Sequence, residues 1–254
     1  MKTLLILAVT ASSAFAAVKS EDITLRDDKR GKDIECRVHF PDAGDKLPLI
    51  VFSHGFGADK TAFATISKHV AEHGYVIVHP SHADGMGRGG LRRGAAEVPA
   101  QEQKPGEPAD NKTGARRFQG LLGAGGGLAG MLNDPAKLEG RVADVVAVLD
   151  SIEQLCTKVP ALKGRIDTTR IGVGGHSYGA YTSMLIGGVT ADIGGAKARS
   201  FADKRVRCIL PISGQGTGQQ GLTESSWSQL KLPMMTMTGS RDRGAGGRFR
   251  GGPC

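Results

Sequence analysis

The segment RIGVGGHSYGAYT, residues 170–182, joins a short apolar run to a helical pattern through a single serine, Ser177, flanked by glycines in GHSYG. This is the pattern G-x-S-x-G. Between a strand and a helix, its glycines relieve crowding around a strained turn that presents the serine hydroxyl at the carboxyl edge of a sheet. The segment therefore predicts a strand, a sharp turn and a helix, with Ser177 as a nucleophile. An ordinary turn serine is the alternative.

Apolar runs alternate with helical patterns on both sides of this segment. Strands that alternate with helices predict the α/β class, with a mostly parallel central sheet and helices on both of its faces. Two alternating segments around DKRGKD predict a hairpin before that sheet. We expect hairpin strands at 22–27 and 34–41, further strands at 47–55, 75–80, 170–175, 206–213 and 232–239, and helices at 59–74 (with Asp59 as N-cap), 138–155 and 178–188.

Composition narrows the classes of function. The chain has 254 residues, enough for one α/β domain with a full core. Its charge of +8 comes from scattered basic residues and only 5% of its residues are aromatic, which favours a solvated surface over a nucleic-acid site. The four cysteines lack the spacing of a zinc site, and Cys36 alternates with apolar residues as a core residue does. We expect no metal and no cofactor. The cysteine pattern does not decide whether the protein has one native disulfide.

The first sixteen residues have the order of a secretory signal peptide. MKTLLILAVTASSAFA has one lysine, a short apolar stretch and a small-residue tract that ends Ala14-Phe15-Ala16. The apolar part is far shorter than the roughly 20 residues that span a bilayer. We expect a signal peptide at 1–16, one domain at 17–254, a secreted or periplasmic protein and no integral membrane segment. A buried N-terminal strand is the alternative.

Two stretches lack any periodic pattern. Residues 81–133 are rich in Gly, Arg, Pro and Gln and predict a long loop, and residues 244–254 predict an irregular tail. Within the loop, Gly125, Gly127 and Gly130 match G-x-G-x-x-G by spacing. Because no strand precedes them, a dinucleotide site is not expected.

A nucleophile that attacks a carbonyl needs hydrogen-bond donors for the oxyanion. In SHGFG, residues 53–57, the glycines let the backbone turn after a strand so that the Phe56 amide can face the pocket. The amide of Tyr178, which follows the nucleophile, is the second expected donor. A simple strand-ending turn at 53–57 is the alternative.

Five segments carry a resemblance to a known family. VFSHGFGA, HGYVIVHPSHADG, RVADVVAVLDSI, IDTTRIGVGGHSYGAYT and PMMTMTGSRDRG follow one another along the chain. In this order they resemble α/β-hydrolase serine esterases similar to platelet-activating factor acetylhydrolases, chlorophyllases and polyester hydrolases, often labelled predicted dienelactone hydrolases. The resemblance implies an α/β-hydrolase fold and an acid after the strand at 232–239, where Asp242 stands. Asp203, at the wrong end of the preceding strand, is the weaker candidate.

The catalytic base is missing from the expected place. The fold's order is serine, acid, histidine, yet all seven histidines precede Ser177 and none follows Asp242. We expect a C-terminally truncated chain without the last strand and helix. It would be a secreted serine hydrolase of small-molecule, lipid or polyester esters, acting through an acyl-enzyme on Ser177 and nearly inactive as written. The alternative is a non-catalytic binding protein on a hydrolase scaffold.

Overall fold

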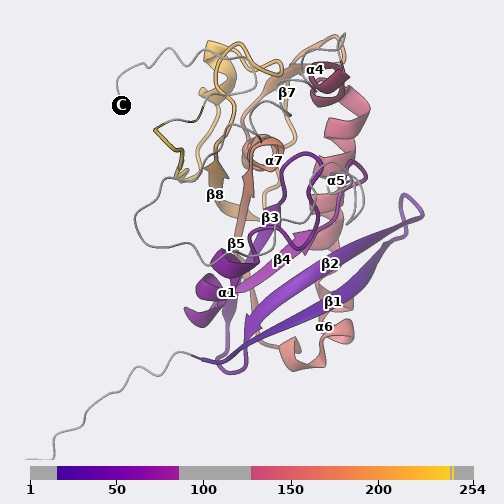
Figure 1. Ribbon diagram of the computed structural model, residues 1–254, viewed down its shortest axis with the longest axis vertical. Helices are drawn as coiled ribbons and strands as arrows, with labels where there is room; N and C mark the ends of the chain where they lie inside the picture. Colours follow the sequence, from indigo (N-terminus) through magenta and orange to yellow (C-terminus); the bar gives the residue numbers. More distant parts are fainter. Residues whose placement is uncertain (1–15, 86–126, 241, 243–254) are drawn as a thin grey trace, which may run out of the picture.

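The computed structural model describes residues 16–85, 127–240 and 242, and their centre is a six-stranded sheet (Figure 1). The strand order is β1-β2-β4-β3-β5-β8. The pairs β1–β2 and β2–β4 are antiparallel, and β4, β3, β5 and β8 run parallel. The strands are β1 (Val18–Asp27), β2 (Lys32–Pro41), β3 (Leu47–Ser53), β4 (Val76–Pro80), β5 (Ile166–His176) and β8 (Val206–Ile212), with a separate hairpin of β6 (Ala191–Ile193) and β7 (Ala196–Arg199).

Helices cover both faces of the sheet, as predicted. The helices are α1 (Ala64–Glu72), α4 (Gly127–Leu132), α5 (Pro135–Asp150), α6 (Ile152–Lys158) and α7 (Tyr178–Gly187), with the short 3-10 turns Pro160–Leu162 and Glu224–Trp227. Neighbouring strand residues point to opposite faces. Val51 accordingly joins the large core with α5 and α7, whereas Phe52 joins a smaller core with α1. Figure 1 shows α1 and α5 on opposite sides of the sheet.

The expected α/β-hydrolase fold is confirmed by this arrangement. The chain enters through an antiparallel hairpin, crosses over to place β3 between β4 and β5, and continues from β5 through a sharp turn into α7. The segment expected as a strand at 232–239 lies beside β8, with parallel bridges Ile209–Met234 and Ile212–Met237. The carboxyl ends of β3, β5 and β8 therefore meet at one edge.

The first helix begins later than predicted, and Asp59 is not its N-cap. The Asp59 carboxylate accepts a hydrogen bond from the Thr61 amide at 2.7 Å, which closes a turn. α1 starts only after Phe63, whose φ of 61° lies in the left-handed region. The Phe63 ring lies 5.3 Å from Phe52 and 5.1 Å from His176. Packing at the end of β5 thus outweighs the local helical pattern.

The predicted helix at 138–155 is two helices. α5 begins after Asp134, whose side chain accepts from the Ala136 amide at 3.0 Å, and Pro135 occupies the first helical position. Ser151 interrupts the pattern, because it ends α5 and precedes α6. The periodicity of the apolar residues continues through this break, so it does not reveal the break.

The predicted loop at 81–133 ends in a helix. α4 occupies residues 127–132, where GLAGML combines leucine, alanine and methionine, all good helix formers. Most of the predicted loop, 86–126, lies outside the described residues, as do most of the predicted signal peptide and the tail at 244–254. No helix in the described ranges is long and apolar enough to cross a membrane. Cys36 is fully buried, and the three described cysteines are free thiols.

Candidate active site

Ser177 occupies the sharp turn between β5 and α7. Its φ of 53° and ψ of −115° lie in a region that residues with a side chain rarely adopt. The turn is anchored because the Ser177 amide donates to the Ile212 carbonyl at 2.9 Å and the Tyr181 amide donates back to the Ser177 carbonyl at 3.1 Å. This strained strand–turn–helix geometry is the one that G-x-S-x-G requires.

The glycines of the motif let three backbone segments approach closely. A Cβ on Gly175 would stand 2.8 Å from the Ser53 carbonyl oxygen, and a Cβ on Gly179 would overlap the same carbonyl group. The end of β3 therefore lies directly against the first turn of α7. Any side chain at either position would push the two apart.

The predicted oxyanion loop at 54–57 lies against Ser177. A Cβ on Gly55 would be 3.6 Å from the Ser177 Cβ, and Gly57 has a φ of 75° that favours glycine. The Phe56 and Tyr178 rings meet edge to face with centroids 6.2 Å apart. The structure thus brings together Ser177 and the backbone of both expected donors, Phe56 and Tyr178.

Asp242 lies beyond the same edge of the sheet. The Ser213 amide donates to Met237 at 2.7 Å, and Asp242 then accepts from the Thr238 hydroxyl at 3.0 Å. Burial lowers the pKa of His176, the residue before Ser177, and the negative charge of Asp242 acts in the opposite direction. Asp203 lies at the opposite end of β8 and pairs with Arg205.

The seven histidines all lie in the described part of the chain, and there none is hydrogen-bonded to the Ser177 hydroxyl. His39 and His79 contact the hydroxyls of Ser20 and Ser67, each at 2.7 Å. His69 lies 3.4 Å from Glu72. His176 packs on Phe63. His54 and His82 belong to a buried network behind the expected oxyanion loop.

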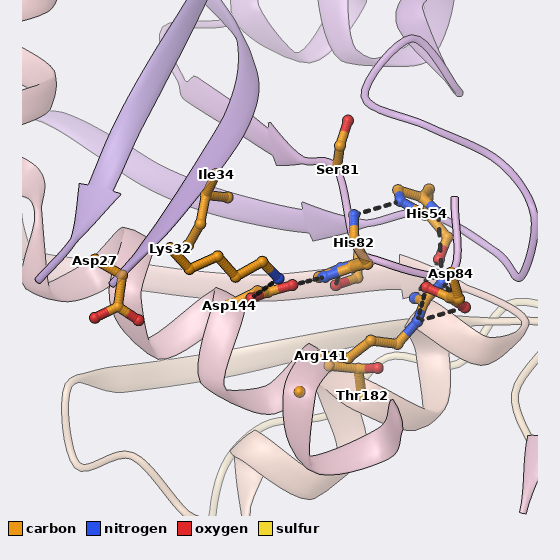
Figure 2. Close-up of polar contacts among 12 residues, drawn as sticks. Asp27, Lys32, Ile34, His54, Ser81, His82, Asp84, Arg141, Asp144 and Thr182 are labelled. Carbon is orange, nitrogen blue, oxygen red and sulfur yellow. Dashed lines mark hydrogen bonds and ion pairs between the residues drawn. The ribbon is translucent and has the colours of Figure 1, made fainter. Parts of the chain in front are cut away.

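That network contains a serine, a histidine and an aspartate in a chain. The Ser53 hydroxyl lies 2.9 Å from His82 Nε2, and His82 Nδ1 lies 3.0 Å from Asp144 Oδ2. The carboxylate can only accept, so Nδ1 carries the proton and the Ser53 hydroxyl donates to Nε2. Asp144 also accepts from Lys32 at 2.7 Å (Figure 2).

The network is inaccessible to a substrate. Ser53 is 0%, His82 4% and Asp144 1% exposed. Burial lowers the pKa of His82 to about 3, so its ring is neutral at neutral pH. Ser53 is the last residue of β3, and its contact with His82 links this strand end to Asp144 on α5. We interpret the Ser53–His82–Asp144 hydrogen bonds as structural, because they hold the end of β3 against α5.

Arg141 is the second feature that the sequence did not reveal. It is 2% exposed and lies on α5, three residues before Asp144. Its guanidinium pairs with Asp84 at 2.9 Å and donates to the His54 carbonyl at 2.7 Å (Figure 2). Burial lowers its pKa, and the Asp84 charge acts in the opposite direction. In the sequence, Arg141 and Asp144 are two charged residues on the otherwise apolar face of a predicted helix, and that pattern indicates buried charges.

With this geometry in place, comparison with known proteins is informative. The sequence profile of the family described as platelet-activating factor acetylhydrolase, isoform II, matches residues 33–90. A dog platelet-activating factor acetylhydrolase is 30% identical over 78% of this chain and 41% of its own length. Over these stretches the chain is similar to platelet-activating factor acetylhydrolases. The profile match covers most of β2, the expected oxyanion loop at 54–57 and the segment that carries His82 and Asp84.

Other platelet-activating factor acetylhydrolases also match parts of this chain. The chicken platelet-activating factor acetylhydrolase is 25% identical over 55% of this chain and 35% of its own. The cattle protein is 45% identical over 16% of this chain and 10% of its own. This chain spans less than half the length of these acetylhydrolases. A solved acetyl xylan esterase from Paenibacillus sp. R4 shares 18% identity, with a TM-score of 0.45 over 84% of this chain and 53% of that one.

The close approach at Gly179 is testable by substitution. We expect Gly179→Ala to lower the free energy of unfolding by more than about 2 kcal/mol, because the new Cβ must displace the end of β3. Gly140→Ala is the matched control, since a Cβ there meets nothing within 4 Å on α5 and should stabilise by roughly 0.5–1 kcal/mol. Urea unfolding measures both, and equal effects of the two substitutions would contradict the assigned packing.

The buried histidines predict a loss of stability in mild acid. Burial lowers the pKa of His79 and His82 to about 3 and that of His54 to about 4, whereas the unfolded chain binds these protons near pH 6.5. Between these values the unfolded state holds more protons. The unfolding free energy should therefore fall as pH drops below about 6.5, by up to about 1.4 kcal/mol per pH unit for each histidine.

Denaturant titrations from pH 7.5 to 4.5 measure this slope. Asp144, whose pKa is lowered to about 2, stays almost fully ionised in both states above about pH 5, so it adds little to the slope there. His79→Gln removes one titrating group and should flatten the slope by one histidine's share. A stability that is constant between pH 7 and 5 would show that these rings are not held neutral.

Proposed function

We propose that this chain has the chemistry of a serine hydrolase of carboxylic esters, with Ser177 as the nucleophile. The observation that carries the proposal is the strained turn at Ser177 with the 54–57 loop against it. The relationship to acetylhydrolases supports the same reaction class. The expected substrate is a small-molecule, lipid or polyester ester, and the similar proteins are named as acetylhydrolases of platelet-activating factor.

The proposed reaction has two steps. The Ser177 oxygen forms a bond to the ester carbonyl carbon, and the carbonyl oxygen takes up negative charge that the Phe56 and Tyr178 amides stabilise. The carbon–oxygen bond to the alcohol then breaks, which leaves an acyl group on Ser177. Water releases this acyl group in a second step. Both steps need a group that accepts and returns the proton.

The mechanism also needs a base that takes the proton from Ser177. Asp242 stands where the acid of a triad would orient a histidine. The histidines closest to Ser177 in the fold have other contacts, however. His54 and His82 are hydrogen-bonded in the buried network, and His176 packs on Phe63. We infer that the 254-residue chain turns over esters slowly, with water as proton acceptor.

We also infer that the chain is exported, on the sequence pattern at residues 1–16. Expressed in a secreting bacterium, the protein should lose about 16 residues. Intact mass spectrometry of the exported protein measures this. Ala16→Asp, which places a charge just before the cut, should remain unprocessed. Exported protein that retains Met1 would contradict the proposal.

The nucleophile is tested by fluorophosphonate labelling. Ser177 should form a bond to phosphorus with loss of fluoride, slowly at pH 7 and faster as hydroxide increases. Loss of a triad base costs on the order of 10⁶-fold in turnover and leaves roughly 10³- to 10⁴-fold over water. Aryl acetate hydrolysis should accordingly be slow. It should not respond to Asp242→Asn, because an acid without an imidazole orients nothing.

Two variants make the labelling test specific. Ser177→Ala should abolish labelling, whereas Ser240→Ala, at an exposed serine, should leave it unchanged. Peptide mapping locates the label. Fast stoichiometric labelling at pH 7 would show that a histidine of this chain serves as base. An unreactive Ser177 at every pH would favour a non-catalytic binding protein.

A further inference from the structure

Arg141 contacts the backbone before one expected oxyanion donor. Its Nη1 donates to the His54 carbonyl at 2.7 Å, and its Nη2 lies 3.4 Å from the Gly55 carbonyl. Asp84 holds the guanidinium in this orientation through Nε at 3.0 Å and Nη2 at 2.9 Å. Because a guanidinium is planar and rigid, pairing along one side fixes where the remaining N–H groups point.

The Gly55–Phe56 peptide is fixed from its carbonyl side. The Gly55 oxygen accepts from His54 Nδ1 at 2.7 Å and from the Ala58 amide at 3.2 Å, besides the Arg141 contact. The C=O and N–H of a trans peptide point in opposite directions. Holding the Gly55 carbonyl toward the interior therefore aims the Phe56 N–H away from it. Hydrogen bonds to the carbonyl also polarise that N–H.

The His54 ring is set for this role. The His82 amide, which can only donate, lies 3.0 Å from His54 Nε2, so Nε2 accepts and Nδ1 carries the proton given to Gly55. Burial, and next the nearby Arg141 charge, lower the pKa of His54 to about 4, so the ring stays neutral. A neutral ring keeps both of these hydrogen bonds.

The same guanidinium contacts the other donor's residue. Its central carbon lies 4.6 Å from the centroid of the Tyr178 ring, within the range of a cation–π contact. Tyr178 is the first residue of α7, and its ring is fully buried. One side chain thus touches the two segments whose amides must converge on a single oxygen atom.

We propose that Arg141 is a positioning residue for the oxyanion site, because it holds the 54–55 backbone before Phe56 and the ring of Tyr178 in one fixed arrangement. The proposal rests on the assignment of the Phe56 and Tyr178 amides as the oxyanion donors. A purely structural arginine would stabilise the fold without setting the orientation of the Gly55–Phe56 peptide. The test therefore observes that peptide directly.

Isotope labelling isolates this one peptide. Phe56 is the only phenylalanine that follows a glycine in the chain. Protein labelled with [1-¹³C]glycine and [¹⁵N]phenylalanine therefore gives one HNCO signal, which reports the Gly55 carbonyl and the Phe56 amide together. The Arg141→Lys substitution keeps the positive charge but removes the planar guanidinium that contacts two carbonyls at once. We therefore expect the Gly55 carbonyl and Phe56 amide signals to move upfield as their hydrogen bonds weaken.

Ser177 phosphonylation supplies a functional reading. Removal of one oxyanion donor costs roughly 10²- to 10³-fold, so a misaimed Phe56 amide should slow labelling of Arg141→Lys by at least about tenfold. Asp84→Asn, which keeps the guanidinium but loosens it, should change both readings in the same direction and less. If the wild-type Ser177 is unreactive, the proposed function fails while the HNCO signal still tests Arg141.

Arg165→Lys is the matched control. Arg165 donates to the carbonyls of Gly44, Pro41 and Ala161 near the other end of the sheet. Its substitution should change neither the HNCO signal nor the rate of Ser177 labelling. In the unmodified protein, a held Arg141 should show slowly rotating, exchange-protected Nη–H groups. Free rotation of that guanidinium, or a folded Arg141→Lys with the wild-type HNCO signal and labelling rate, would overturn the proposal.

Discussion

The structure depends on the close approach between the end of β3 and the first turn of α7. Ser53 brings its carbonyl to within a distance that only glycine at positions 175 and 179 permits. This approach bends the chain at Ser177 into a backbone region that costs of order 1–3 kcal/mol. It also puts the 54–57 loop beside the serine. The positions of the proposed nucleophile and of the proposed oxyanion donors thus follow from one steric constraint.

Helix α5 supports this arrangement through hydrogen bonds from two charged side chains. Arg141 and Asp144 leave one turn of the helix toward the same sheet edge, the first to the 54–55 backbone and the second to His82. An unpaired charge in such a place would be costly, and each is paired: Arg141 with Asp84, Asp144 with Lys32. The hydrogen bonds of these polar groups fix the orientation of the groups they contact, and apolar packing does so less strictly.

The sequence predicts most of the fold because its signals are local. Apolar runs locate the strands, and G-x-S-x-G locates the elbow. Where a local signal competes with tertiary contacts, it fails: Asp59 has the composition of a helix cap, yet Phe63 packs on Phe52 and delays α1. The β6–β7 hairpin turns at Gly194 and Gly195, both at positive φ, and a Gly-Gly pair favours such a two-residue turn.

The site is only partly predictable for a similar reason. Ser177, Phe56 and Tyr178 lie in two motifs, and the structure brings those motifs together. Arg141 meets Asp84 and His54 across 57 and 87 positions of sequence. No spacing rule links residues so far apart. A charged residue on an apolar helix face indicates burial, but its partners emerge only when the sheet edge is assembled.

The Ser53–His82–Asp144 chain has a consequence for how active sites are recognised. Its atoms satisfy the distances by which a geometric template identifies a catalytic triad, and its residue types are the right ones. A search on these criteria would select it in preference to Ser177, which has no histidine partner in the described residues. Solvent access separates the two, because Ser53 has none. In folds of this kind, a template needs an exposure condition on the nucleophile before its matches are informative about catalysis.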